Sequence, residues 1–318
     1  MKRVISILVS LIILVVIYTK IDFTRLIAVF QNCDRSWMAI SLGMVVPLTL
    51  FTSWRLQQLM PSGSRLGFLE ANRLILAASV LNMVLPSKMG DIAKAYFMKQ
   101  RGHLGGTLSL SLVIFEKACD MLSLLLWCVF GLLVYPQKTW LFWVMTVAVG
   151  VGLVMGVLLL ASKKFAYFFF LVARKIAPKK LRLKLETMQA SWGEMHDYFW
   201  RDRVQLIKIT GTSIFIWFLH LLQIWFFILA LKAWTPFLAN LALSPLAILA
   251  GLLPLTFAGV GTRDAALVLF YQPYFDGATA AALGVLCTSR YLLPAIGGLP
   301  FLGQFLATVR GIKGESGE

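Results

Sequence analysis

Four ionisable residues stand inside long apolar stretches of the chain, where their types and spacing could do chemistry. Glu116, Lys117 and Asp120 belong to one stretch, and Arg290 belongs to a later one. Glu116 and Asp120 are one helical turn apart, so a helix places both on one face. A charge inside a membrane costs about 2.5–3.5 kcal/mol on insertion scales, so it pairs with another charge or lines a wet cavity. These residues are candidates for binding a polar group, and structural ion pairs are the alternative.

Arg290 has no acidic residue beside it in the run 288–294. Because a buried arginine needs a counter-charge, its partner is expected to come from another segment. The candidate partners are Asp91, Glu116, Asp120 and Asp264.

Two short breaks in apolar segments have the composition of an anion-binding loop. Ser87, Lys88, Gly90 and Asp91 belong to the first break, and Gly259, Gly261, Thr262, Arg263 and Asp264 belong to the second. Glycine lets a backbone approach a ligand closely, and the N-terminus of a following helix offers free N–H groups to an anion. Basic residues, Lys94 among them, supply positive charge for a phosphate. The alternative is that the two aspartates only cap their helices, and one loop can serve both purposes.

The composition excludes a soluble globule. Hydrophobic residues make up 59% of the 318 residues and charged residues 14%, and the mean hydropathy is +0.81, whereas soluble domains carry about a quarter charged residues. The net charge of +16 fits basic cytoplasmic loops of a membrane protein. Without an ATPase loop, a nucleophile elbow or metal-binding spacing of the four cysteines, we expect no enzymatic activity, no cofactor, no metal and no nucleic-acid partner.

The apolar stretches predict an all-α, polytopic membrane protein, one transmembrane domain over 1–318. Six are expected to span a bilayer, for which about 20 residues suffice, namely 4–18, 37–54, 106–135, 140–161, 209–231 and 278–306. The first of them is short but uncharged. No small-residue cleavage site follows the first, so we expect a retained helix. We expect the protein in a bacterial or archaeal cytoplasmic membrane. The positive-inside rule predicts cytoplasmic termini. The basic segment 162–208, with eleven Lys/Arg against four Asp/Glu, is also expected there, and its part 165–176 is expected to lie along the interface.

The two broken regions echo each other and predict an inverted repeat. Each has Leu-Pro, then a glycine-bearing break, then an aspartate that opens a helix. Glu116 follows Asp91 by 25 residues, and Arg290 follows Asp264 by 26. We expect two re-entrant hairpin units, 67–135 and 236–309, that face a shared polar cavity, as in many transporters.

In order and spacing, these motifs resemble the transmembrane, flippase-like domain of lysylphosphatidylglycerol synthases. The resemblance covers nearly the whole chain and rests on Asn82, Leu85-Pro86-Ser87-Lys88-Met89-Gly90-Asp91, Lys94, Glu116, Lys117, Asp120, Gly259-Val260-Gly261-Thr262-Arg263-Asp264 and Arg290. It implies that these residues bind substrate. The family usually has Glu at the two aspartates and Arg at Lys94 and often at Lys117. Charge is kept, but lysine lacks the bidentate geometry of arginine.

The resemblance implies a protein that moves or handles an anionic, aminoacylated or prenyl-linked lipid. No aminoacyl-transferase domain follows the last helix, so synthase activity is not expected. The alternative is an accessory protein that presents lipid to a partner glycosyltransferase or lipid-modifying synthase, with the basic segment 162–208 as its docking surface. A third reading is a membrane enzyme in which Glu116 and Asp120 act as acid and base.

Overall fold

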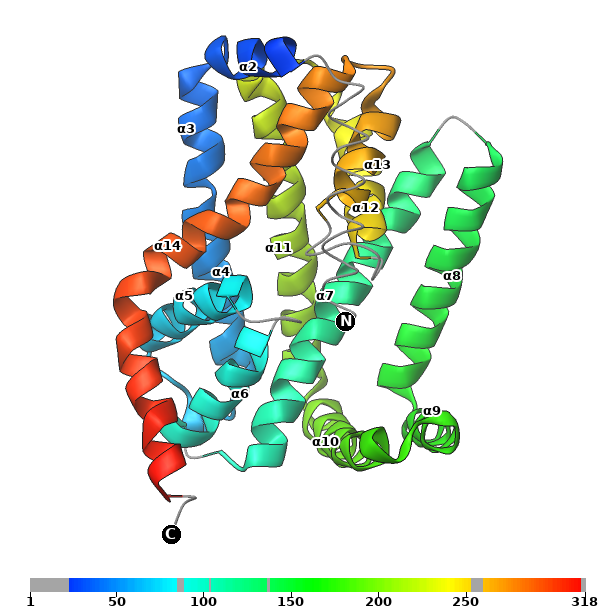
Figure 1. Cartoon of the computed structure of the whole chain (residues 1–318). Helices are drawn as coiled ribbons and strands as arrows, with labels where there is room; N and C mark the ends of the chain where they lie inside the picture. Colours follow the sequence, from blue (N-terminus) through cyan, green and yellow to red (C-terminus); the bar gives the residue numbers. More distant parts are fainter. Residues whose placement is uncertain (1–22, 85–88, 103, 136–137, 253–259, 316–318) are drawn as a thin grey trace. The chain divides into compact units, whose positions relative to one another are not determined.

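A computed structural model describes residues 23–84, 89–102, 104–135, 138–252 and 260–315, and their regular elements are all helices (Figure 1). In chain order they are α2 Phe23–Gln31, α3 Arg35–Gly43, α4 Val45–Leu59, the short 3-10 helix Ser62–Ser64, α5 Phe68–Val84, α6 Met89–Arg101, α7 Gly106–Val134, α8 Trp140–Ala161, α9 Lys163–Ile176, α10 Lys179–Arg201, α11 Arg203–Ala230, α12 Phe237–Gly251, α13 Thr262–Tyr271 and α14 Gly277–Glu315. The prediction of an all-helical protein is confirmed.

Five described stretches are long and apolar enough to cross a membrane. They are Arg35–Leu59, Gly106–Val134, Trp140–Ala161, Arg203–Ala230 and Gly277–Gly303. A helix satisfies its backbone hydrogen bonds internally, which is what hydrocarbon demands of a spanning segment. Five predicted spans are therefore confirmed, and the chain is a multi-pass membrane protein. The sixth predicted span, 4–18, lies outside the described residues.

The contacts of the chain divide it into two compact units. Unit 1 comprises the described residues of Met1–Val46, Ser123–Gly152 and Trp217–Arg290, and unit 2 comprises those of Pro47–Leu122, Leu153–Ile216 and Tyr291–Glu318. Among the described residues, α12 packs against α13 in unit 1, and in unit 2 α5 packs against α6 and α9 against α10. The pairs α12–α13 and α5–α6 are the two predicted hairpins. Each unit also holds the first part of the long helix that follows its hairpin. That these pairs re-enter the membrane as an inverted repeat stays a prediction.

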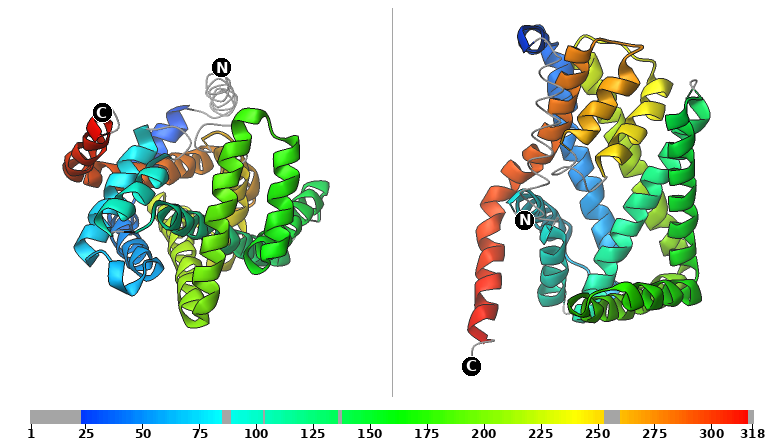
Figure 2. Two further views of the ribbon diagram at one scale, coloured as in Figure 1. Left: turned by 90° about the horizontal axis from the view of Figure 1, so that it is seen from below. Right: turned by 45° about the vertical axis from the view of Figure 1, so that its right-hand side comes forward.

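The basic segment of unit 2 is helical, and its helix α10 is fixed to the end of α8. Trp192 and Trp200 each donate an indole N–H to a carbonyl of the last turn of α8, at 3.0 Å, and His196 lies 3.4 Å from a third. Their spacing of four residues places the three rings on one face of α10. Because the last carbonyls of a helix lack partners within it, these rings complete α8. Figure 2 shows α9 and α10 running crosswise to that end.

Helix α9 begins at a polar cap and exposes apolar side chains. The hydroxyl of Ser162 accepts a hydrogen bond from the backbone N–H of Phe165 at 3.2 Å, which starts the helix. The exposed apolar side chains are Tyr167, Phe168, Phe169, Leu171, Val172 and Ile176. The predicted helix in this part of the chain is confirmed, and its position along the membrane interface stays a prediction.

Gly131 marks a close approach of α7 to α12 in unit 1. A Cβ atom added there would meet the backbone carbonyl of Ala242, and backbone cannot move aside as a flexible side chain can. Gly131→Ala should therefore lower the free energy of unfolding by about 1–3 kcal/mol, the usual cost of overpacking. Gly150→Ala is the matched control, because nothing lies within 4 Å of its added Cβ. Unfolding in detergent micelles titrated with SDS would measure both, and equal stability would contradict the close contact.

Candidate functional site: two buried charged clusters

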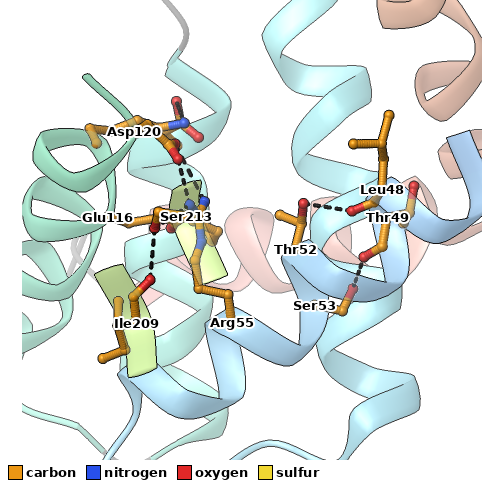
Figure 3. A network of polar contacts seen from close by, with 12 residues as sticks. Leu48, Thr49, Thr52, Ser53, Arg55, Glu116, Asp120, Ile209 and Ser213 are labelled. Carbon is orange, nitrogen blue, oxygen red and sulfur yellow. Dashed lines mark hydrogen bonds and ion pairs between the residues drawn. The ribbon is translucent and has the colours of Figure 1, made fainter. Parts of the chain in front are cut away.

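Arg55 is the centre of a buried cluster in unit 2 (Figure 3). Its Nη2 donates to Glu116 Oε1 at 2.9 Å and its Nη1 donates to Ser213 Oγ at 2.9 Å. Both Nη atoms also donate to the carboxylate of Asp120, Nη2 at 3.3 Å. The guanidinium thus joins α4 to α7 and α11 with its side chain only 3% exposed. A bidentate arginine–carboxylate contact is among the stronger polar contacts in proteins.

The turn of α4 before Arg55 keeps its own hydroxyl groups satisfied. Thr52 donates to the carbonyl of Leu48 at 2.7 Å, and Ser53 donates to that of Thr49 at 2.8 Å. Such bonds to the preceding turn let hydroxyl side chains sit in a membrane helix without an outside partner. Of these three polar side chains, Arg55 is the one that reaches across to α7 and α11.

Glu116 is shared by two cations. Lys94 of α6 pairs with Oε2, while Arg55 holds Oε1. The side chains of Lys94 and Glu116 are both 2% exposed. A buried charge is tolerated where it is paired and hydrogen-bonded, and here one carboxylate serves α4, α6 and α7 together.

The edge of this cluster is more open than its centre. The side chain of Asp120 is 24% exposed. Lys117, which is 46% exposed, lies 3.2 Å from the carboxylate of Asp91. Among the described residues the cluster therefore contains three bases and three acids, so its charges balance. The bases are Arg55, Lys94 and Lys117, and the acids are Asp91, Glu116 and Asp120.

Unit 1 holds a second cluster, built on Arg263 of α13. Arg263 donates to Asp264 at 2.7 and 3.0 Å, to the carbonyl of Gly284 at 3.0 Å and to the hydroxyl of Thr288 at 2.7 Å. The last two contacts tie α13 to α14. Asp264 also accepts a hydrogen bond from the backbone N–H of Gly261 at 3.0 Å. Asp264 therefore caps α13 and neutralises its basic neighbour at once.

Two glycines make this arrangement possible. Gly261 has φ 104°, a left-handed backbone conformation that residues other than glycine rarely adopt. A Cβ on Gly284 would lie 2.8 Å from Asp264 Oδ1. The start of α13 therefore depends on glycine at position 261, and the position of the Asp264 carboxylate depends on the absence of a Cβ atom at Gly284.

The structure places the other predicted site residues as follows. Gly90 is a packing contact, since a Cβ there would meet the carbonyl of Ala78 and, at 2.7 Å, Asn82 Oδ1. Thr262 is the first residue of α13, and Arg290 is buried on α14. Ser87, Lys88 and Gly259 lie outside the described residues.

Each acid considered as a partner of Arg290 forms an ion pair with another base. The pairs are Asp91 with Lys117, Glu116 with Lys94 and Arg55, Asp120 with Arg55, and Asp264 with Arg263.

The sequence did not single out Arg55 or Ser213 as site residues. Arg55 ends the apolar stretch 37–54, which made it look like a charge at a membrane surface. A signal that could have found it is that Leu48 and Leu59, seven residues before and four residues after Arg55 on the same helix face, are apolar, and both are buried. Ser213 gave no signal in an otherwise ordinary apolar segment.

A polar network in unit 1 was also missed. Asn240 donates to the carbonyl of Leu221 at 2.9 Å and accepts from Ser244 and Tyr271 at 2.9 and 2.8 Å. The three side chains are buried and join α11, α12 and α13. Asn240 and Ser244, four residues apart in an apolar helix, were the signal that could have found it.

Comparison with known proteins agrees with this architecture. Residues 3–298 match the family described as the lysylphosphatidylglycerol synthase TM region. A UPF0104 membrane protein of Methanocaldococcus jannaschii is 21% identical over 314 residues, an alignment that covers 93% of this chain and 92% of the relative. In the described residues no group of three or more His, Cys, Asp or Glu is placed to hold a metal. Because the family match spans most of its length, the chain belongs to the lysylphosphatidylglycerol synthase TM region family.

Proposed function

We propose that this protein is a lipid translocase that carries an anionic or aminoacylated headgroup through the membrane along a polar path. The observation that supports it most is the cluster of Arg55, Lys94, Glu116 and Asp120, in which Arg55, Glu116 and Asp120 belong to stretches long and apolar enough to span a membrane. A family named for part of a lipid-modifying synthase supports a lipid as the substrate class.

The physical reason lies in the cost of moving a charged headgroup through hydrocarbon. Fixed charges along the path replace the water that the headgroup loses, as polar groups lining a channel do. Buried ion pairs are also weak evidence for stability, since apolar residues of similar size often stabilise as well or better. A role in function therefore explains why these charges are buried, at a cost in free energy, better than a role in stability does.

The experiment is a lipid-flipping assay in reconstituted vesicles. Vesicles carry fluorescent phosphatidylglycerol, lysylphosphatidylglycerol or a prenyl phosphate, and an impermeant quencher reports the fraction in the outer leaflet. We expect vesicles with protein to expose the inner-leaflet pool of at least one lipid much faster than empty vesicles. Rates equal to those of empty vesicles for all three lipids would contradict the proposal.

A second candidate is an accessory protein that presents lipid to a partner enzyme, and the basic helices α9 and α10 favour it. Deleting this segment would not be a clean test, because Trp192 and Trp200 complete the end of α8. Reversing the exposed charges Lys164 and Lys175 with glutamate leaves those contacts intact. If docking is the function, cells with this double variant should make less of the partner enzyme's lipid product. The purified variant should still flip lipid at the wild-type rate.

A further inference from the structure

We propose that Asp120 holds the place of a phosphate oxyanion on Arg55, and that the phosphate of a lipid headgroup displaces it. This inference rests on the proposed function, because it names the group that the same cluster would take. The contact to be replaced is present: both Nη atoms of Arg55 donate to the Asp120 carboxylate. The planar fork of arginine fits a phosphate as well as it fits a carboxylate.

The two carboxylates bound to Arg55 differ in how far their side chains are exposed. The side chain of Asp120 is 24% exposed, whereas that of Glu116 is 2% exposed. Glu116 is also bound to Lys94. A ligand can reach the place of Asp120 from outside the packed helices, but exchanging Glu116 would require them to separate.

The charge balance defines the ligand. Once Asp120 turns away, Arg55 and Lys94 share the single charge of Glu116, and one positive charge remains uncompensated. A buried charge without a counter-charge is strongly unfavourable. One monoanionic phosphate restores the balance, whereas a headgroup without phosphate does not.

The remaining contacts hold Arg55 in position for this exchange. Ser213 accepts from Nη1 at 2.9 Å and donates its own hydrogen to the carbonyl of Ile209 at 3.0 Å. Glu116 holds Nη2 at 2.9 Å. Nε of Arg55 is buried and has no hydrogen-bond acceptor among the described residues, so the guanidinium still has a donor to offer.

The test is Asp120→Asn in the purified full-length protein, with binding measured against dihexanoylphosphatidylglycerol, inorganic phosphate and dihexanoylglycerol. Removing the competing carboxylate should tighten binding of the phosphatidylglycerol about tenfold, the size of effect that one adjacent charge has on an ionic equilibrium. Asp120→Glu keeps the competitor and should not gain. Unchanged or weaker binding by Asp120→Asn would overturn the inference.

Two further variants secure the result. Arg55→Lys on the Asp120→Asn background should abolish the gain, because lysine lacks the fork, and a retained gain would place the phosphate elsewhere and overturn the inference. Asp197→Asn is the matched control in unit 2, where a hydrogen bond from Lys163 holds the pKa of the Asp197 carboxyl below its usual value. Its affinity should equal that of wild type, and a similar gain there would mean a general charge effect and overturn the site.

The ligands separate the two sources of phosphate. Tightening for inorganic phosphate as well supports an oxyanion site that needs no lipid tails, and tightening for the lipid alone supports one that does. Dihexanoylglycerol should show no gain, and a gain there would overturn the role of phosphate. If wild type flips lipid but Asp120→Asn binds no tighter, this inference alone fails. If binding behaves as expected but no lipid is flipped, the proposed function alone fails.

Discussion

Replacing Glu116 with glutamine should lower the free energy of unfolding by about 3–5 kcal/mol, the typical cost of removing one partner from a buried ion pair. Glutamine keeps the shape of the side chain but removes the charge that Arg55 and Lys94 share. Lys94, only 2% exposed, would then keep its charge in a medium of low polarity. Unfolding in SDS-titrated micelles, followed by tryptophan fluorescence, measures the loss.

A second substitution separates structure from transport. Lys94→Met added to Glu116→Gln removes both charges and leaves Arg55 with Asp120, so much of the lost stability should return. Lipid flipping should stay low in the double variant if Glu116 belongs to the transport path. Recovery of flipping together with stability would show instead that the pair is structural. A double variant as unstable as Glu116→Gln alone would contradict the pairing itself.

The second large effect is expected from Asp264→Asn, which should cost about 3–5 kcal/mol of unfolding free energy. Asp264 is the charged partner of Arg263, and both side chains are at most 10% exposed. Asparagine can still accept the hydrogen bond from the N–H of Gly261, so the cap survives and the charge does not. The same micelle unfolding measures the change.

Asp91→Asn is the matched control for this prediction, because Asp91 occupies the equivalent place in the echo. Its partner Lys117 is 46% exposed, although Asp91 itself is 14% exposed, and ion pairs that reach solvent contribute less than buried ones. Asp91→Asn should therefore cost clearly less stability than Asp264→Asn. Equal losses at the two aspartates would contradict the difference in their surroundings.

Fold class and spans could be predicted because they depend on neighbouring residues. A run of about 20 apolar residues crosses the hydrocarbon core as a helix whatever surrounds it. The stretches 106–135 and 140–161 gave α7 and α8 almost to the residue. The order of motifs around Asp91 and Asp264 likewise predicted the family, since that order is a property of the chain alone.

The partners of the charged residues could not be predicted in the same way. Arg55 is 61 residues from Glu116 and 158 from Ser213 along the chain, and only the packing of α4 against α7 and α11 brings them together. The similarity of the two broken regions predicted equivalent roles for Asp91 and Asp264. In the structure Asp91 pairs with the half-exposed Lys117, whereas Asp264 pairs with the buried Arg263.

The sequence by itself therefore determined that this is a helical membrane protein of a lipid-related family, with charges inside its spans. The tertiary structure decided which charges meet and how deeply each pair is buried. The physical reason is that helix formation in a membrane is local, whereas the energy of a charge depends on the burial and partners that distant segments supply. Glu116 and Asp120 share a helix face by sequence, and only the packing of the helices buries Glu116 to 2% exposure while leaving Asp120 24% exposed.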